Sequence, residues 1–266
     1  GPIVIVGGGA SGVILAAHLL SSANPSLRVS LIEKREVFGQ GIAYAASLPD
    51  HVLNVSAQGM SAYAADPEHF RRWLSGRGLA LDDATPFYAP RSLYGEYLGQ
   101  ILAELATREP ARLRLIREEC VSVVATPSGV ELRMANGTSV VGRVAVLAVG
   151  HDENPAPEQS YAVRIGSEAD TPLDPEASVL ILGTGLSMDD AWLTLQNRGH
   201  RGPIIAVSRR GLLPSAHRKG KPLRLDSADI PLGTELSYFV GWFRDLVRAV
   251  EKSGGNWRDV VDGIRP

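Results

Sequence analysis

Three glycines that directly follow a run of β-branched residues are the first feature of this sequence that points to chemistry. Gly7, Gly9 and Gly12 have the G-x-G-x-x-G spacing that follows the first strand of dinucleotide-binding folds. The first glycine permits a tight turn, the second lets a pyrophosphate approach the backbone, and the third lets the next helix pack closely on the strand. That helix would begin at Ala10 and Ser11, with its free N–H groups facing the phosphates. We therefore predict a nucleotide site here.

An acidic residue stands where such a site needs one. A second strand is predicted over residues 27–32, and Glu33 at its end follows Gly12 by about twenty residues. A carboxylate at that place accepts hydrogen bonds from the ribose hydroxyls and repels a 2′-phosphate. Glu33, with Lys34 beside it, is thus predicted to bind an adenosine that carries no extra phosphate.

The chain repeats this pattern from residue 178 onward. A buried strand is again followed by a glycine turn, at Gly183 and Gly185, and by a helix that would begin at Leu186 and Ser187. Met188 stands where the third glycine would be, which makes this fingerprint the weaker of the two. We interpret the segment as a second nucleotide-binding unit, and the alternative is an ordinary strand-to-helix turn.

The second unit ends its second strand differently from the first. Ser208, Arg209 and Arg210 stand where the first unit has its acid. A guanidinium binds phosphate through two parallel hydrogen bonds, so these residues would bind a 2′-phosphate. The alternative is a solvated pair of surface arginines. We predict that the second site prefers NADP(H) to NAD(H).

The elements that must position these residues indicate an α/β fold with two Rossmann-like units, each built in three layers around a parallel sheet. Residues 3–6 suit a strand that is covered on both faces. Residues 36–116 interrupt the alternation of strands and helices, so we predict a helical insertion there. One of its helices would have Asp66 as N-cap and Pro67 at its first position.

A β-meander is predicted over about residues 119–149. Its turns would lie at Ser128-Gly129 and Asn136-Gly137. The chain would then return through residues 144–149 into the parallel sheet of the first unit. The first unit therefore combines a parallel sheet, a helical insertion and a meander.

The predicted domain division follows from a segment rich in proline. Residues 151–176 have no periodicity and are interpreted as a linker. A first domain would cover residues 1–150, and a second, incomplete domain would cover residues 177–266. Because the chain stops within a helical pattern, we expect that it is truncated at the C-terminus.

Composition excludes several classes of protein. The chain has 27 Lys and Arg residues against 29 Asp and Glu residues, which gives no electrostatic footprint for nucleic acid. It has no membrane-spanning stretch and no signal peptide, so we expect a cytoplasmic protein. The single cysteine, Cys120, rules out an internal disulfide and a dithiol redox pair. No histidine pair has metal-ligand spacing, so no metal is expected.

The residues predicted to contact the adenosine ribose differ between the two units, an acid in the first and two arginines in the second. This difference indicates two different nucleotides. A β-meander inserted before the last sheet strand is a feature of flavin-binding units in two-nucleotide flavoproteins. We therefore predict FAD in the first unit and NADPH in the second. The cofactors would carry the electrons, while the fold orients them and excludes water.

Three segments, 39–74, 90–98 and 182–218, are similar to the bacterial FAD-NAD(P)-binding protein family. More distantly, they resemble the flavin-dependent lysine and ornithine N-hydroxylases. The resemblance implies that the loop 39–44 lies along FAD and that Asn54 and Met60-Ser61 approach the isoalloxazine side. It also implies that the strand ending at residues 149–151 forms a small-residue turn over FAD. The further cofactor-binding positions that it implies are Gly41, Asn54, Met60, Val121 and Gly150.

The function that the resemblance implies is an FAD-dependent, NADPH-utilising oxidoreductase. In its most specific form, the resemblance implies that this oxidoreductase is a monooxygenase. It would hydroxylate a small nucleophilic substrate through a flavin C4a-hydroperoxide. In that case Asn54 would bond to the flavin adduct and His151 would steer protons. Two alternatives stay open: an NADPH-dependent flavin reductase that acts on a small acceptor without oxygen activation, and a non-catalytic sensor that binds FAD and NAD(P).

Overall fold

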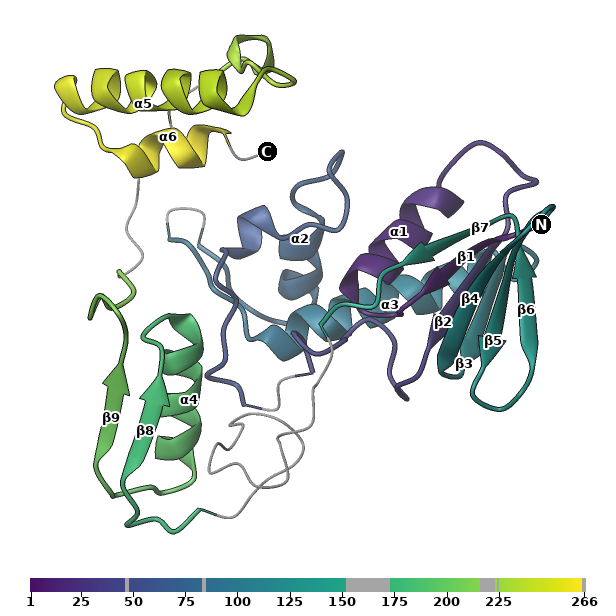
Figure 1. Ribbon diagram of the computed structural model, residues 1–266, viewed down its shortest axis with the longest axis horizontal. Helices are drawn as coiled ribbons and strands as arrows, with labels where there is room; N and C mark the ends of the chain where they lie inside the picture. Colours follow the sequence, from purple (N-terminus) through teal and green to yellow (C-terminus); the bar gives the residue numbers. More distant parts are fainter. Residues whose placement is uncertain (46–47, 83–84, 152–172, 216–222, 224, 265–266) are drawn as a thin grey trace. The chain divides into compact units, whose positions relative to one another are not determined.

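The computed structural model describes residues 1–45, 48–82, 85–151, 173–215, 223 and 225–264 (Figure 1). The chain divides into two compact units, Gly1–Gly211 and Leu212–Pro266. Among the described residues, no helix is both long and apolar enough to cross a membrane. All the predicted cofactor-binding residues lie in the first compact unit.

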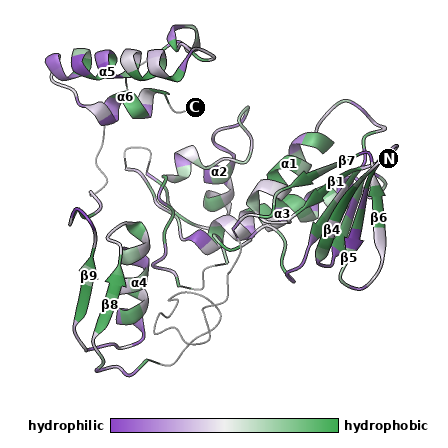
Figure 2. Ribbon diagram, viewed as in Figure 1, coloured by the Kyte–Doolittle hydropathy of each residue, from purple (hydrophilic) through white to green (hydrophobic). Residues whose placement is uncertain are grey.

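A parallel sheet forms the centre of the first unit. Its strand order is β3-β2-β1-β7, and β1 (Ile3–Val6) pairs with both β2 (Val29–Glu33) and β7 (Val144–Leu147). Strand β2 is buried along its whole length. Figure 2 shows the inner strands as hydrophobic, as expected for strands that are covered on both faces. The predicted parallel sheet is confirmed.

The two faces of the sheet bury different layers because alternate strand residues point to opposite sides. Ile5 belongs to a core with residues of helices α1 (Ala10–Leu20) and α3 (Arg91–Arg108). Val4 and Val6 belong to a second core with residues of the β-meander. Full burial of an aliphatic side chain of this size contributes about 1.5–3 kcal/mol. The sheet is thus stabilised from both sides.

The β-meander consists of three antiparallel strands, β4 (Cys120–Thr126), β5 (Gly129–Met134) and β6 (Ser139–Gly142). Both predicted turns are present. Gly129 and Gly137, the glycines of these two turns, have positive φ angles of 148° and 83°. The predicted meander and its return into the sheet through β7 are therefore confirmed.

The predicted helical insertion was too long at its C-terminal end. Residues Leu113–Arg117 form strand β3, which pairs in parallel with β2 at the edge of the sheet. Leu113 is buried, whereas Arg114 is exposed. An edge strand tolerates charged side chains. Because of these charges, the residues of β3 do not show the apolar run that is typical of a covered strand. The remaining insertion contains a 3-10 helix (Ala57–Gly59), α2 (His69–Gly76) and α3.

Helix α2 begins later than the sequence predicted. Its first residue is His69, and the Asp66 side chain makes no cap. The Asp66 carboxylate instead forms an ion pair with Arg72, within α2. The backbone oxygen of Asp66 accepts the N–H of His69 at 3.1 Å. The Asp66 side chain, which we expected to cap the helix, thus pairs with Arg72 of the same helix.

The second glycine turn lies between β8 (Val179–Leu182) and α4 (Leu186–Asn197). Strand β9 (Ile204–Val207) pairs with β8 in parallel. The predicted domain boundary at residue 177 falls inside the first compact unit, and most of the predicted linker lies outside the described residues. The proposed division into domains therefore stays a prediction.

The unit Leu212–Pro266 contains a 3-10 helix (Ser227–Asp229) and the helices α5 (Leu236–Lys252) and α6 (Trp257–Ile264). The two α-helices pack against each other. None of the α5 side chains is fully buried.

Candidate functional site

The first glycine turn joins β1 to α1 without room for side chains. Gly7 has a φ of 105°, and a Cβ there would lie 2.2 Å from the carbonyl oxygen of Ala148. A Cβ at Gly12 would lie 1.9 Å from the carbonyl oxygen of Gly7. Both distances are far below van der Waals contact, so only glycine fits. Helix α1 begins at Ala10, and its first N–H groups have no partner within the helix.

A cavity of about 760 Å³ opens beside this turn. Besides the turn, its walls are residues 32–35 at the end of β2, the loop 40–44, residues 118–120 and residues 148–151. The volume lies in the usual range for cofactor pockets. The predicted site residues that the structure brings together on these walls are Gly7, Gly9, Ala10, Ser11, Glu33, Lys34, Gly41, Gly150 and His151.

Glu33 lies buried at the end of β2, on the wall of this cavity. Its Oε2 accepts the N–H of Gly8 at 2.7 Å, and its Oε1 accepts the N–H of Arg35 at 2.9 Å. Each carboxylate oxygen can accept a further hydrogen bond. The backbone therefore holds the carboxylate in place while leaving it able to accept hydroxyl groups from the cavity.

The loop 39–44 is held against helix α3. A Cβ at Gly95 would lie 2.8 Å from the carbonyl oxygen of Tyr44, so the loop approaches α3 closely only because this residue is glycine. The ring of Tyr44 also packs edge-on against Tyr94, with 4.8 Å between the ring centroids. Helix α3 thus positions one wall of the cavity.

Gly95→Ala is expected to weaken FAD binding about tenfold or more. Overpacking against a backbone atom costs about 1–3 kcal/mol, and the loop 39–44 must shift to relieve it. Gly99→Ala is the matched control, because it lies in the same helix and its Cβ would meet the Phe38 carbonyl oxygen at an ordinary 3.6 Å. Both variants gain about 1 kcal/mol of helix propensity. Fluorescence titration with FAD measures the affinities, and equal values for both variants would contradict the prediction.

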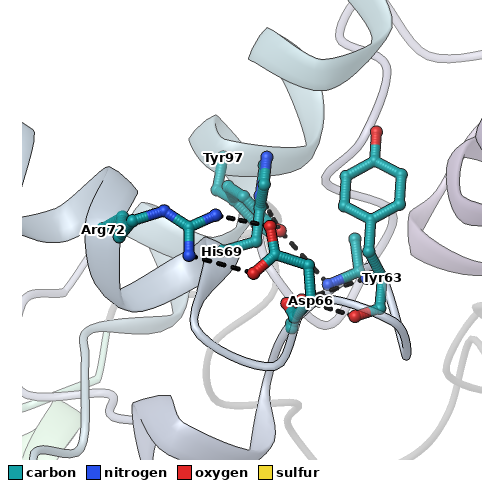
Figure 3. A network of polar contacts seen from close by, with 7 residues as sticks. Tyr63, Asp66, His69, Arg72 and Tyr97 are labelled. Carbon is teal, nitrogen blue, oxygen red and sulfur yellow. Dashed lines mark hydrogen bonds and ion pairs between the residues drawn. The ribbon is translucent and has the colours of Figure 1, made fainter.

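The segment before α2 is held to α3 by a polar network (Figure 3). The Tyr97 hydroxyl accepts the N–H of Ala62 at 3.2 Å and lies 2.7 Å from Nδ1 of His69. Burial raises the pKa of Tyr97, so the phenol keeps its proton at neutral pH. Ser61 Oγ donates to the carbonyl oxygen of Asp66 at 2.7 Å. These bonds hold the segment that was predicted to approach the isoalloxazine.

Tyr97→Phe is expected to lower the free energy of unfolding by about 1–3 kcal/mol, because the buried N–H of Ala62 loses its acceptor. Tyr63→Phe is the control, since the Tyr63 hydroxyl has no hydrogen-bond partner among the described residues and points away from the network (Figure 3). Urea unfolding followed by circular dichroism measures both. If the two variants have the same stability, the Tyr97 hydroxyl is not a structural group.

The second glycine turn repeats the backbone of the first. Gly183 has a φ of 107°, close to the 105° of Gly7. Its N–H donates to the carbonyl oxygen of Val207 at 2.8 Å, as the N–H of Gly7 donates to that of Ile32 at 2.8 Å. This shared geometry favours a second nucleotide-binding unit.

The second turn is less crowded than the first. Gly185 is the N-cap of α4, whose exposed first residues are Leu186 and Ser187. A Cβ at Gly183 would meet nothing within 4 Å among the described residues. In the first unit, β7 pairs with the edge of β1 opposite β2. At the corresponding edge of β8, opposite β9, no described strand is present. The half-buried Met188 is accommodated inside α4.

The end of β9 is tied to the second glycine turn. Ser208 Oγ accepts the hydroxyl of Thr184 at 2.7 Å and the N–H of Gly211 at 3.1 Å. Arg209 and Arg210 follow directly and are exposed. Their charges are therefore accessible at the place where the fold brings the end of the second strand close to the turn.

Four residues predicted to bind FAD do not lie on the walls of the cavity. Gly12 is buried against the backbone of Gly7. Asn54 is exposed, and Met60 packs against the hydrophobic core. Val121 is exposed in β4, next to the wall residue Cys120. Their cofactor-binding roles stay predictions, as does the catalytic role of Asn54.

The wall formed by residues 118–120 was not predicted from the sequence. These residues follow β3, whose carboxyl end lies beside that of β2. Lys34 Nζ lies 3.4 Å from Oε1 of Glu119, so a predicted and a missed wall residue form an exposed ion pair. Ligands of open parallel sheets bind at the carboxyl ends of the strands. Recognising β3 as a strand would therefore have identified this wall.

Two glycine turns, each between a parallel strand and a helix, define a dinucleotide-binding α/β protein. A family model described as FAD-NAD(P)-binding matches residues 4–152, more than half of the chain. The chain belongs to this FAD-NAD(P)-binding family. A search of curated proteins finds no significant match.

Solved structures share the fold at low sequence identity. A cyclohexanone monooxygenase mutant from Rhodococcus sp. Phi1 bound to NADP+ is 16% identical, with a TM-score of 0.53 over 95% of this chain and 44% of that chain. OTEMO in complex with FAD and NADP is 15% identical, with a TM-score of 0.52 over 78% and 39%. A flavin-containing monooxygenase from Stenotrophomonas maltophilia is 18% identical, with a TM-score of 0.51 over 80% and 59%. The chain spans less than two thirds of each of these proteins.

Proposed function

We propose that the protein is an oxidoreductase that binds FAD in the first cavity and uses NADPH. The observation that carries this proposal is a cavity of suitable volume with the glycine turn and the Glu33 carboxylate on its walls. The glycine turn has no space for a Cβ at Gly7 or Gly12 and faces the start of α1. These features suit a dinucleotide whose pyrophosphate lies at the helix N-terminus and whose ribose bonds to Glu33.

The second turn would hold NADPH. The turn at Gly183 would take the pyrophosphate, and Arg209 and Arg210 would bind the 2′-phosphate. When bound, the flavin supplies hydride and electron transfer, which protein side chains perform poorly. The chain itself binds and orients both nucleotides and selects between them by charge.

The finer proposal is that the protein activates oxygen and hydroxylates a small nucleophilic substrate. It is supported by the three solved structures above, which are named as monooxygenases or, for OTEMO, contain FAD and NADP. His151 lies on the wall of the cavity and would move a proton there. Asn54 is exposed and does not lie on the walls of the cavity, so it is the weaker candidate for a catalytic role.

The test of the oxidoreductase proposal is an absorption spectrum of the purified protein with FAD, followed by NADPH without oxygen. We expect a flavin band that bleaches on addition of NADPH. A protein that binds FAD but shows no bleaching would instead be the non-catalytic sensor. On readmission of oxygen, hydroxylation of a panel of primary amines in proportion to the NADPH consumed would separate a monooxygenase from a reductase.

A further inference from the structure

Helix α4, which follows the second glycine turn, carries a polar stripe on one face. Asp190, Thr194 and Asn197 lie at the i, i+4 and i+7 positions, so their side chains share one side of the helix. Each bonds to Arg91 at the start of α3 or to the segment 50–52. The stripe therefore joins the second nucleotide-binding unit to the helical insertion of the first.

The central contact is the ion pair between Arg91 and Asp190. Nη1 of Arg91 lies 2.9 Å from Oδ2, and Nη2 donates to Oδ1 at 3.2 Å, which is bidentate geometry. The two side chains are 25% and 26% exposed. Arg91 Nε also donates to the carbonyl oxygen of Val52 at 3.0 Å, and its backbone N–H donates to that of His51 at 2.8 Å. The guanidinium is thus held in position for Asp190.

His51 adds a buried contact to this ion pair. His51 is 7% exposed and Thr194 is 2% exposed. Nε2 of His51 lies 3.2 Å from Thr194 Oγ1 and 3.3 Å from the carbonyl oxygen of Asp190. Asn197 Nδ2 donates to Oδ2 of Asp50 at 3.2 Å. Because unpaired buried polar groups are costly, these bonds favour the arrangement in which α4 stays against the segment 50–52.

The same contacts reach toward both predicted cofactor sites. Tyr44 lies on the wall of the first cavity. Its ring packs edge-on against Tyr94, with 4.8 Å between the ring centroids, and Tyr94 lies three residues after Arg91 in α3. Asp190 lies about one turn after Leu186, where α4 begins. Arg91 is therefore linked to the cavity wall on one side and to the second glycine turn on the other.

We propose that His51, Arg91 and Asp190 form a junction that fixes the second glycine turn relative to the first cavity. Arg91 and Asp190 are positioning residues for the passage of electrons between the two nucleotides, and they are not catalytic residues. This inference rests on the proposed function. Directional bonds hold the junction, so its loss shifts the turn while every cofactor contact stays available.

The first experiment is independent of activity. Hydrogen exchange of Asp190→Asn, which keeps the side-chain shape, is expected to increase in both α4 and the segment 50–52. Glu176→Gln is the matched control, because it removes an exposed ion pair that Glu176, just before β8, forms with Arg201, just before β9. Unchanged exchange in Asp190→Asn relative to this control would overturn the junction.

The second experiment measures anaerobic flavin reduction by saturating NADPH in a stopped-flow instrument. A misplacement of about 1 Å costs up to about a hundredfold in rate, so Asp190→Asn is expected to reduce flavin at least about tenfold more slowly. The dissociation constants for FAD and NADPH should stay within about twofold. The exchange of charges in Arg91→Asp/Asp190→Arg is expected to restore part of the rate, and Glu176→Gln should match the unmodified protein.

The outcomes separate this inference from the proposed function. Increased exchange with an unchanged reduction rate would overturn the positioning role, because the junction would then be structural alone. A slow variant beside an unmodified protein that is readily reduced supports both proposals. If NADPH fails to reduce even the unmodified protein, the proposed function fails and the positioning role fails with it, while the exchange data still decide whether the junction exists.

Discussion

Gly12→Ala is expected to abolish measurable FAD binding, with an affinity at least about a hundredfold lower. The added Cβ would lie 1.9 Å from the carbonyl oxygen of Gly7. The Cβ is bonded directly to the Cα and the oxygen belongs to the backbone, so no side-chain rotation relieves the clash. Helix α1 must therefore move from β1, which displaces the N–H groups that face the cavity. The upper range of overpacking costs, about 3 kcal/mol, corresponds to roughly a hundredfold in affinity.

The measurement is FAD titration together with the free energy of unfolding. Gly99→Ala is again the comparison, since it also places an alanine inside a helix but meets only ordinary contacts. We expect Gly12→Ala to lose both affinity and stability and Gly99→Ala to keep both. Normal FAD affinity in Gly12→Ala would show that the nucleotide does not depend on the close packing of this turn.

Replacing Arg209 and Arg210 together by alanine is expected to reduce the preference for NADPH over NADH by about a hundredfold. Hydrogen bonds to charged groups contribute about 1.5–3 kcal/mol each, and these two exposed guanidinium groups follow the end of β9. The affinity for NADH should change little, because NADH lacks the phosphate that they would bind.

The ratio of kcat/KM for the two coenzymes measures this preference. Arg114→Ala removes an exposed arginine from β3 and is expected to leave the ratio unchanged. Two results would contradict the charge argument: an unchanged ratio in the double variant, or an equal loss for NADPH and NADH. In either case the arginines would be solvated surface residues.

Local chemistry explains which parts of the fold were predictable. Residues 3–6 are β-branched and apolar, and such a run favours a covered strand whatever surrounds it. Gly7 has a positive φ that other residues rarely adopt, so its place in the sequence already marks the turn. The hairpin turns at Gly129 and Gly137 were predictable for the same reason.

Strand β3 and the wall at residues 118–120 were not predictable in this way. The strand lies at the edge of the sheet, where charged residues such as Arg114 are tolerated. Its identity depends on pairing with β2, which lies about eighty residues earlier in the chain. The position of the wall at residues 118–120 depends on the same pairing, because these residues directly follow β3.

The sequence by itself determined the two glycine turns and the charge that ends each second strand, because these depend on backbone angles and residue types over short stretches. Only the tertiary structure decided how the loop 39–44 meets α3 and how Asp190 meets Arg91. In the sequence, Asp190, Thr194 and Asn197 are indistinguishable from a solvated helix face. Their partners are about a hundred or more residues away, and only folding brings such distant groups within hydrogen-bond distance.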